Sequence, residues 1–273
     1  MAITLRSRRE IELMRAAGAV VADVLSKLQE DAEPGLTTAR LDKIAAQMAA
    51  DAGAQALFKG VRSPHARAPF PGAICASINE QVVHGIPSES TKLKQGDILS
   101  IDFGAILQGY CADATVTIGI GDISHDNRRL IEVTKQVLDI AIAKAKPAVK
   151  WSEIAAQMQH CAESAGFSVV REFVGHGIGR KMHEEPRVPN FVSDELLSND
   201  IVLTEGMILA VEPMINAGSS AVRTLKNGWT VVTKDGKCSA HFEHTIAIVE
   251  NGCEVLTKIA GSCEFSSRSL SDS

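Results

Sequence analysis

The chain has 273 residues, of which 45% are hydrophobic and 22% are charged, and its formal net charge is -5 at pH 7. This composition is typical of a globular protein that can bury a sizeable core, and it excludes a disordered, collagenous or fibrous chain. The mildly acidic balance argues against nucleic acid or an anionic membrane as the main partner, because both attract clustered Lys and Arg.

The six cysteines are spread along the chain and form no C-x-x-C pair. Their spacing suits neither a zinc ribbon nor a disulfide scaffold, and it favours free thiols in a reducing cytosol. No window reaches the roughly 18 uninterrupted apolar residues that a membrane helix needs. Gly18 and Asp23 interrupt the N-terminal apolar stretch, which lacks the cleavage site of a signal peptide. We therefore expect a cytoplasmic protein without membrane segments.

The N-terminal part of the chain is predicted to be helical. Apolar residues at three-and-four spacing indicate a helix over residues 8–31, which ends before the Glu-Pro-Gly sequence at 33–35. Thr37 or Thr38 can cap a second helix, and Gly53 would terminate it.

From residue 69 onward the sequence is rich in turns and in β-like segments. Residues 73–78 resemble a strand, 98–103 form an apolar run, and 110–118 alternate between apolar and polar side chains. Gln108 and Gly109 indicate a tight hairpin between the last two segments.

Two more helices are predicted before the chain returns to short strands and loops at 168–257. Ser124 or Asp126 caps the first of these helices, which ends near Lys146, and Ser152 opens the second, which ends near Gly166. The order of elements indicates an α+β fold with two weakly similar halves of about 120 residues each. We expect one compact domain over residues 1–257, with antiparallel strands and outer helices, and a polar tail at 258–273.

Four acidic residues stand in otherwise apolar segments: Asp102, Asp113, Glu212 and Glu243. An isolated Asp is more often a cap or turn residue, but Asp102 and Asp113 flank one hairpin and could face each other on adjacent strands. Burying an ionised carboxylate costs several kcal/mol unless a positive charge compensates. Because Lys and Arg are absent from these segments, two divalent cations, which carry a charge of about +4, would balance the four acids.

His176 is the candidate nitrogen ligand for such cations. It lies in a Gly-His-Gly sequence between apolar residues, and the glycines predict a slim, turn-prone backbone. A lone His is more often structural, but this context offers little to pack an imidazole. An oxygen-rich cluster with one nitrogen ligand suits Mn, Fe, Co or Zn. The glycine spacing does not match a phosphate-binding loop.

Two further histidines, His84 and His183, are ordinary surface residues when each is taken alone. Beside a metal cluster they become candidates for proton transfer or carbonyl binding. The remaining histidines, His241 and His244 among them, are interpreted as structural or solvent-facing. The chain has no G-x-S-x-G sequence and no recognisable context for a catalytic cysteine.

Together these segments resemble the methionine aminopeptidases of type I, which belong to the pita-bread metallopeptidases. The order Asp, Asp, His, Glu, Glu is specific for the pita-bread superfamily, and the neighbouring blocks narrow the resemblance to type I. The matching blocks follow in order between Arg8 and about Thr257 and comprise 79–87, 96–102, 109–113, 175–186, 212–213, 227–230 and 242–245.

The resemblance implies a pita-bread fold and a binuclear site for two divalent ions. The five implied protein ligands are Asp102, Asp113, His176, Glu212 and Glu243, with Asp113 and Glu243 bridging the ions. The implied activity is removal of the N-terminal methionine from peptides and nascent proteins, with a preference for a small second residue. A metal-activated water would attack the first peptide bond, and Glu212 is the implied general base.

The resemblance also implies residues that bind the substrate. His84 would approach the scissile amide, and His183 would donate a hydrogen bond to its carbonyl oxygen. Four residues are the implied lining of a pocket for the methionine side chain, namely Phe70, Cys75, Met182 and Trp229. Residues 62–69 differ from the tyrosine-containing segment usual in the family, and Met182 replaces a more usual Phe.

The implied substrate is the N-terminus of a peptide or nascent chain, and the ribosome stays open as a further partner. The ligand set accepts Co, Mn, Fe or Zn without deciding between them. We expect a monomer of the short form, without a zinc-binding extension before Met1.

Two other activities are compatible with parts of the sequence. An Xaa-Pro peptidase shares the five ligands, but such enzymes usually carry a separate N-terminal domain for which this chain has no room. A metal-free binding protein of the same fold would have no need to retain all five ligands.

Overall fold

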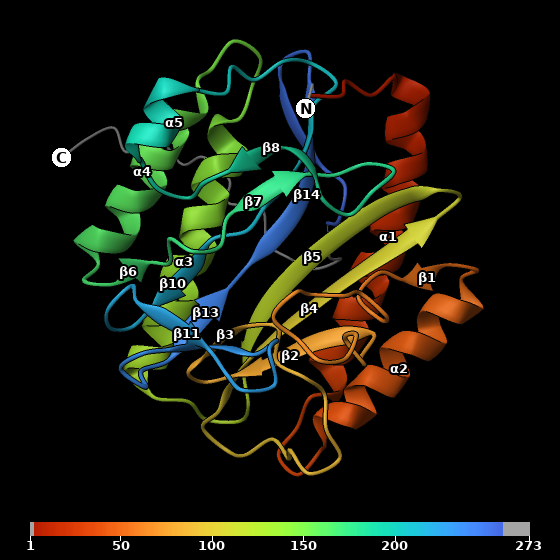
Figure 1. Cartoon of the computed structure of the whole chain (residues 1–273), viewed down its shortest axis with the longest axis vertical. Coiled ribbons are helices and arrows are strands. Elements are labelled where there is room, and N and C mark those ends of the chain that lie inside the picture. Colours follow the sequence, from red (N-terminus) through yellow and green to blue (C-terminus); the bar gives the residue numbers. More distant parts are fainter. Residues whose placement is uncertain (1–2, 259–273) are drawn as a thin grey trace, which may run out of the picture.

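A computed structural model describes residues 3–258 of the chain (Figure 1). The predicted polar tail, apart from Lys258, lies outside the described residues. The helices are α1 (Arg8–Asp31), α2 (Thr38–Asp51), α3 (His125–Lys144), α4 (Trp151–Ser164) and α5 (Asp194–Ser198). The strands are β1 (Gln55–Ala56), β2 (Ile74–Ile78), β3 (Gln81–Val83), β4 (Ile98–Leu107), β5 (Tyr110–Gly119), β6 (Ser168–Val169), β7 (Gly175–Gly177), β8 (Glu184–Val188), β9 (Ile208–Val211), β10 (Met214–Asn216), β11 (Val222–Thr224), β12 (Val231–Thr233), β13 (Ser239–His241), β14 (Glu243–Val249) and β15 (Gly252–Val255).

The first two helices begin and end where the sequence predicts. At the start of α1, the Ser7 side chain accepts a hydrogen bond from the Glu10 N–H, and the Glu10 carboxylate accepts one from the Ser7 N–H. This capping box satisfies two backbone donors that the helix itself leaves unpaired. Thr37 caps α2 in the same way by accepting from the Arg40 N–H. Both helices pack against the strands that follow them, with α1 on β4 and β5.

The second pair of helices differs slightly from the prediction. Ser124 caps α3 as expected, but α4 begins at Trp151 with Lys150 at its N-cap rather than at Ser152. A short helix, α5, interrupts the stretch that was predicted as strands and loops, and Ser193 caps it. In Figure 1 α1 and α2 lie on one side of the molecule and α3 and α4 on the other, with the strands between them.

One large antiparallel sheet connects strands from both halves of the chain. Its main path runs β1-β4-β5-β14-β9-β7-β8, with β2 paired to β4 and β15 paired to β14. Two smaller sheets, β13-β10-β6 and β11-β12-β3, complete the β-structure of the described residues. The pairing of β5 with β14 brings the central hairpin against a strand more than a hundred residues away, and the functional side chains gather at this junction.

The β4–β5 hairpin has the tight turn that the sequence predicts. Leu107 pairs with Tyr110, so that only Gln108 and Gly109 form the turn. Both turn residues have positive φ, 51° and 80°. A two-residue turn of this kind matches the twist of the flanking strands and fixes their register.

The core lies in two main clusters of buried side chains. One surrounds α3 and α4, and the other lies between α1, α2 and the β4–β5 hairpin; Phe242 packs against both. Among residues 3–258, no helix is long and apolar enough to cross a membrane.

Candidate active site

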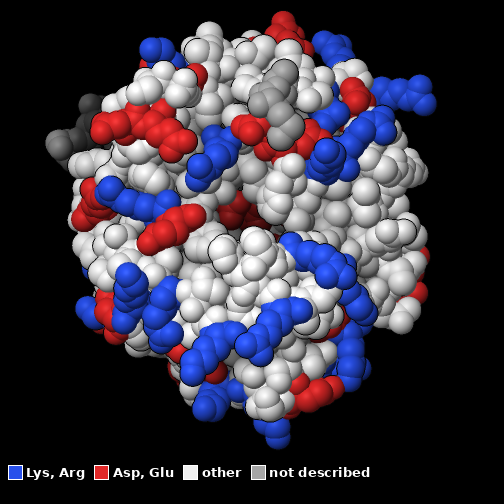
Figure 2. Space-filling model, in the orientation of Figure 1, with Lys and Arg blue, Asp and Glu red and all other residues white. Residues whose placement is uncertain are grey.

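A cavity of about 350 Å³ opens on the face shown in Figure 2, where a hollow near the centre has acidic side chains in its depth. All residues that the sequence analysis singled out for metal or substrate binding line this cavity: Phe70, Cys75, His84, Asp102, Asp113, His176, Met182, His183, Glu212, Trp229 and Glu243. They come from both halves of the chain and from several strands and loops. The structure therefore brings the whole predicted set together.

The central hairpin positions Asp102 and Asp113, but not as a directly opposed pair. Asp102 lies opposite Thr115, and Asp113 lies opposite Gly104. The two acids are thus offset by two residues along the hairpin, which places them diagonally on the same face of the sheet. The expectation that they face each other across the strands is corrected to this diagonal arrangement.

The two glutamates approach from the neighbouring strands. Glu212 directly follows β9, rather than lying inside a strand as its apolar context suggests, and Glu243 is the first residue of β14. The Glu243 carboxylate accepts a hydrogen bond of 2.9 Å from the Thr115 hydroxyl. The backbone carbonyl of Glu212 accepts one of 3.0 Å from the Asn190 side chain. Each glutamate is therefore held by a polar partner on another segment.

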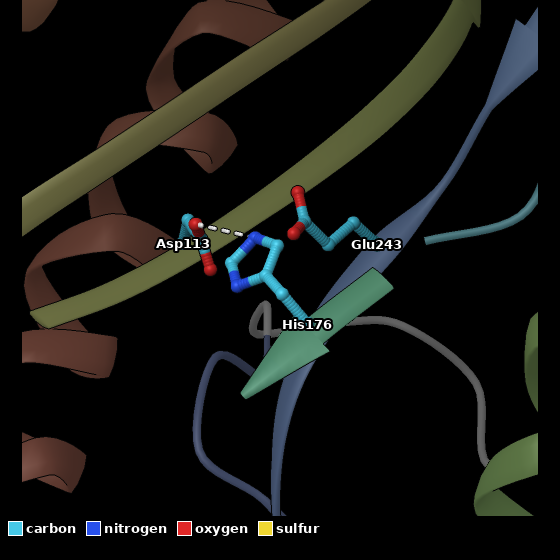
Figure 3. Close-up of side chains that lie close together, drawn as sticks. All are labelled: Asp113, His176 and Glu243. Carbon is cyan, nitrogen blue, oxygen red and sulfur yellow. Dashed lines mark ion pairs between the residues drawn. The ribbon is translucent and has the colours of Figure 1, made fainter. Parts of the chain in front are cut away.

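His176 lies on β7 with its ring directed at the acids (Figure 3). Its Nε2 is 3.6 Å from Glu212 Oε1 and 3.9 Å from Asp113 Oδ2. Asp113, His176 and Glu243 each offer one atom to a group whose members lie within 4.8 Å of one another. Asp102 and Glu212 line the same cavity without belonging to that tightest group.

The glycines beside His176 have a different role from the one predicted. Gly175 and Gly177 are in a strand, not in a turn. A Cβ atom on Gly175 would lie 2.4 Å from the Ala210 carbonyl oxygen, and one on Gly177 would lie 2.2 Å from that of Glu185. These positions require glycine because neighbouring backbone approaches too closely for any side chain.

Burial dominates the electrostatics of the acids. It raises the pKa of Asp102 to about 8, with the charge of Asp113 adding to the effect, and it raises that of Asp113 to about 7. Burial and the neighbouring carboxylates raise the pKa of Glu212 and Glu243 well above the usual value. Without added positive charge, the cluster would therefore hold protons near neutral pH.

Three observations show that these residues fit divalent cations. The donors are carboxylate oxygens with one imidazole nitrogen, which suits borderline and hard metal ions. His176 Nδ1 lies 2.9 Å from the Gly177 carbonyl oxygen, so Nδ1 can carry the proton and leave Nε2 free to ligate. Asp102 Oδ1 is buried and lacks a hydrogen-bond partner among the described residues. Such an orphaned acceptor is costly unless a cation or donor reaches it.

His84 and His183 line the same cavity. The His183 ring lies edge-to-face with His176, with ring centroids 4.4 Å apart. The His84 ring contacts Phe173 and Trp229, at centroid distances of 5.8 Å and 6.4 Å. Burial lowers the pKa of His84 to about 4 and also lowers that of His183. Both rings are therefore neutral near pH 7 and can each donate one N–H.

An apolar wall adjoins the acids. The rings of Phe70 and Trp229 meet edge-to-face at 5.2 Å, and the Trp229 indole N–H donates to the Ala68 carbonyl at 3.0 Å. The Cys75 thiol is buried beside Asp102, and burial raises its pKa well above the usual value. The cavity is also lined by Phe58 and Val61, which the sequence did not indicate, and by Arg62, Ser63 and Pro64 from the segment 62–69 that differs from the family.

His241 is the main functional candidate that sequence reasoning missed. It was interpreted as structural or solvent-facing, but its side chain is buried and its Nε2 lies 3.6 Å from Glu212 Oε2. The signal that could have indicated it is its position two residues before Glu243, because alternate residues of an extended chain share a face. His244, by contrast, turns away and its Nδ1 lies 2.9 Å from the Thr257 hydroxyl.

A buried acidic cluster with imidazoles, set in a curled antiparallel sheet with outer helices, defines a metalloenzyme of the pita-bread fold, as the family resemblance implies. The model of the metallopeptidase family M24 matches residues 12–250. The chain therefore belongs to metallopeptidase family M24, whose members use divalent metal ions, and it is a hydrolase.

Individual relatives agree with this assignment. The chain is 47% identical over 257 residues to a methionine aminopeptidase of Clostridium perfringens, covering 94% of this chain and 99% of that protein. The crystal structure of a methionine aminopeptidase from Thermotoga maritima superposes with a TM-score of 0.88 at 39% identity, covering 94% of this chain and all (100%) of that one.

A prolidase from Pyrococcus furiosus is a more distant likeness. It has a TM-score of 0.69 and 22% identity, and the match covers 93% of this chain but 65% of the prolidase. At this identity the likeness shows the shared fold alone, so it does not favour the Xaa-Pro alternative.

Proposed function

We propose that the chain is a methionine aminopeptidase that removes the N-terminal methionine from peptides and nascent chains whose second residue is small. The observation that carries the proposal is a single cavity in which an acidic cluster, two neutral histidines and an apolar wall meet. The identity to methionine aminopeptidases over most of the chain supports the same activity.

The proposed metal ligands are Asp102, Asp113, His176, Glu212 and Glu243, holding two divalent ions between them. When bound, such ions polarise the scissile carbonyl and make water a stronger nucleophile at neutral pH. The tight grouping of Asp113, His176 and Glu243 supports their part in this site. This donor set accepts Co, Mn, Fe or Zn.

The other polar residues have proposed roles in moving protons and binding the peptide bond. Glu212 would take a proton from the attacking water at its carboxylate and pass it to the leaving amine. It lines the cavity and lies 3.6 Å from both His176 and His241. His183 would donate its N–H to the carbonyl oxygen as negative charge develops there. His84, which lines the same cavity, would contact the amide nitrogen.

The apolar wall would bind the methionine side chain. Phe70, Cys75, Met182 and Trp229 line the cavity beside the acids, and they offer aromatic and sulfur contacts to an unbranched thioether. A small second residue is expected because the cavity of about 350 Å³ must also hold the start of the following chain.

The proposal extends to the setting in which the protein works. We propose a monomer in the cytoplasm that acts on emerging N-termini, with the ribosome as a partner still to be tested. Size measurement by analytical ultracentrifugation tests the monomer, and co-sedimentation with ribosomes tests the partner.

The deciding experiment incubates the protein, reconstituted separately with Mn, Fe, Co or Zn, with the peptides Met-Ala-Ser, Met-Leu-Ser and an Xaa-Pro tripeptide. We expect release of methionine from Met-Ala-Ser in preference to Met-Leu-Ser, and none after treatment with a chelator. An N-acetylated Met-Ala-Ser serves as the control that lacks a free amine. Cleavage of the Xaa-Pro peptide instead, or no turnover with any metal, would overturn the proposal.

A further inference from the structure

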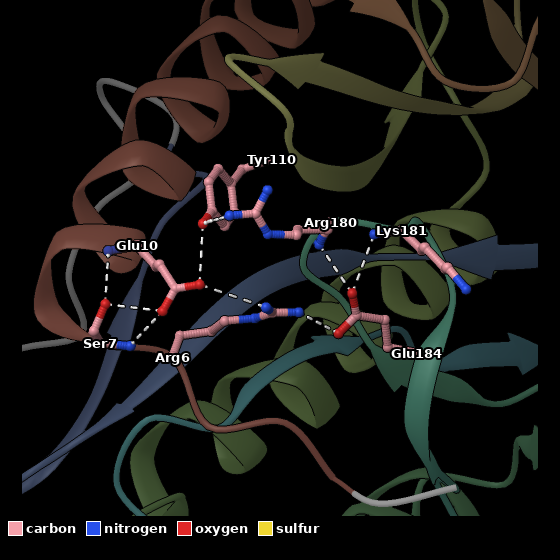
Figure 4. A network of polar contacts seen from close by, with 7 residues as sticks. All are labelled: Arg6, Ser7, Glu10, Tyr110, Arg180, Lys181 and Glu184. Carbon is pink, nitrogen blue, oxygen red and sulfur yellow. Dashed lines mark hydrogen bonds and ion pairs between the residues drawn. The ribbon is translucent and has the colours of Figure 1, made fainter.

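The loop between β7 and β8 carries Met182 and His183 into the cavity, and the carboxylate of Glu184 fixes its conformation. Glu184 Oε1 accepts hydrogen bonds from the backbone N–H groups of Arg180 and Lys181, at 2.9 Å and 3.1 Å (Figure 4). The loop therefore folds back on the residue that directly follows His183. A shift of the Glu184 side chain would release the loop and, with it, the imidazole.

The second oxygen of Glu184 is held from the N-terminal segment. Arg6 Nη2 donates to Glu184 Oε2 at 2.5 Å, and the side chains are 7% and 17% exposed. The Arg6 backbone N–H donates to the Gly206 carbonyl oxygen at 2.7 Å, so the segment itself is anchored. A charge-assisted pair that is shielded from water is stronger and more rigid than an exposed one.

Gly179 makes room for this arrangement within the loop. A Cβ atom on Gly179 would lie 2.1 Å from Arg6 Nη2, so the guanidinium lies directly against the backbone of the loop. The Gly179 carbonyl oxygen accepts from the Cys111 N–H at 2.7 Å, which holds the loop to the end of the central hairpin. The loop is thus clamped between Arg6 and β5.

A second set of contacts connects the loop to the start of α1, through Arg180 and Tyr110. Arg180 Nη2 donates to the Tyr110 hydroxyl at 2.7 Å, and its guanidinium lies 4.6 Å from the Tyr110 ring centroid. The Tyr110 hydroxyl donates to Glu10 Oε1 at 3.0 Å, and that oxygen lies 3.6 Å from Arg6 Nη1. Figure 4 shows these side chains meeting between the start of α1 and the loop.

We propose that Arg6 is a positioning residue for the reaction, acting through Glu184 and the 178–183 loop to hold His183 in the cavity. This inference rests on the proposed function. Glu184 connects Arg6 to this loop through both of its carboxylate oxygens. One oxygen accepts from Arg6, and the other accepts from the backbone N–H groups of Arg180 and Lys181 within the loop. Arg6 thereby contributes to a site whose cavity it does not line.

The test compares Arg6→Ala with Arg15→Ala in the metal-loaded protein. Arg15 is the matched control because it also forms ion pairs at α1, with Glu254 and Glu12, neither of which lies in the 178–183 loop. We expect Arg6→Ala to lower kcat on Met-Ala-Ser about 10- to 100-fold at unchanged metal content, because a displacement of about 1 Å suffices for such a loss. KM should rise as well, because Met182 lies on the same loop and lines the same cavity. Arg15→Ala should retain the wild-type kcat. Arg6→Lys should recover part of the loss, since an ammonium can still pair with Glu184.

A double variant separates positioning from a general loss of stability. If Arg6 acts through His183, then Arg6→Ala combined with His183→Ala should be no slower than His183→Ala alone. Losses that multiply, an unchanged kcat in Arg6→Ala, or an equal loss in Arg15→Ala would overturn the proposal. Should Arg6→Ala fail to fold, Arg6→Lys and Glu184→Gln take its place in the same comparison.

The loop can also be followed without substrate. The methyl NMR signal of Met182 should shift or broaden in Arg6→Ala and stay unchanged in Arg15→Ala. An unchanged Met182 signal in Arg6→Ala would contradict the inference even in an active protein. Wild-type protein that releases no methionine would instead overturn the proposed function, while the NMR comparison would still decide whether Arg6 holds the loop.

Discussion

The imidazole of His241 lies against the carboxylate of Glu212, with Nε2 3.6 Å from Oε2. The side chains are 3% and 14% exposed, so the contact is largely shielded from water. Burial lowers the pKa of His241 to about 3, which leaves the ring neutral, and among the described residues its Nε2 has no hydrogen-bond partner. His241 is therefore a neutral ring packed beside the Glu212 carboxylate, where it restricts the space into which that side chain can rotate.

We predict that His241→Ala weakens metal binding or turnover about 10-fold or more, as the loss of a group that orients a ligand generally does. Loss of the ring would let the Glu212 side chain rotate. His241→Gln is the matched variant, because its amide can place an N–H near the same point. Metal affinity by calorimetry and kcat on Met-Ala-Ser check the prediction. An alanine variant with wild-type values of both would contradict it.

The acidic cluster should make the metal-free protein less stable as the pH rises from about 6.5 to about 8. Asp102, with a pKa of about 8, and Asp113, with a pKa of about 7, hold protons in the folded state that the unfolded chain has already released. Where the folded state binds more protons than the unfolded state, the free energy of unfolding falls with rising pH. The slope can reach about 1.4 kcal/mol per pH unit for each such group.

Below pH 6.5 the buried histidines oppose this trend. Burial lowers the pKa values of His84, His241 and His244 to about 4, 3 and 4, so acid protonates the unfolded state first and destabilises the fold. The carboxylate effect is therefore cleanest above the ordinary histidine pKa of about 6.5. Urea unfolding in EDTA at several pH values between about 6.5 and about 8 measures how the free energy of unfolding changes with pH. Added Mn should flatten the slope, and Asp102→Asn should reduce it; a flat profile in EDTA would refute the explanation.

Substitution of His84 or His183 should lower turnover more than it lowers the bound metal content. We expect His183→Ala and His84→Asn each to lower kcat about 100-fold or more, which is the range for removing a hydrogen-bond donor that acts in the transition state. Asn is chosen at position 84 because His84 has a φ of 59°, a conformation that Asn tolerates better than Ala. Asp113→Asn is the comparison that should lose metal. Metal analysis after gel filtration distinguishes the two classes, and a histidine variant that simply loses its metal would show that the role is misassigned.

Gly177→Ala should destabilise the fold and disturb His176. Its Cβ would lie 2.2 Å from the Glu185 carbonyl oxygen, so the two strands would have to separate. We expect a loss of about 1–3 kcal/mol in the free energy of unfolding, which is typical of overpacking. Gly252→Ala is the control, since nothing lies within 4 Å of a Cβ there. Equal unfolding midpoints in urea for the two variants would contradict this explanation.

Local patterns in the sequence determined most of the secondary structure. The limits of α1 follow from its amphipathic spacing and from a cap that lies within four residues, at Ser7 and Glu10. The turn at Gln108 and Gly109 follows from residues that accept positive φ. Such features depend on neighbours in the chain, and therefore a single sequence reveals them.

The chemistry of the site could also be predicted from the sequence. Acids in apolar segments without nearby Lys or Arg need a compensating positive charge once they are buried, and metal ions can supply it. Tertiary structure alone decided how the atoms meet: the diagonal offset of Asp102 and Asp113, the strand contacts that require Gly177, and the contact of His241 with Glu212. These relationships depend on strand register and on backbones that approach from distant parts of the chain. No local pattern encodes such distances, since they arise only when the sheet closes and its side chains pack.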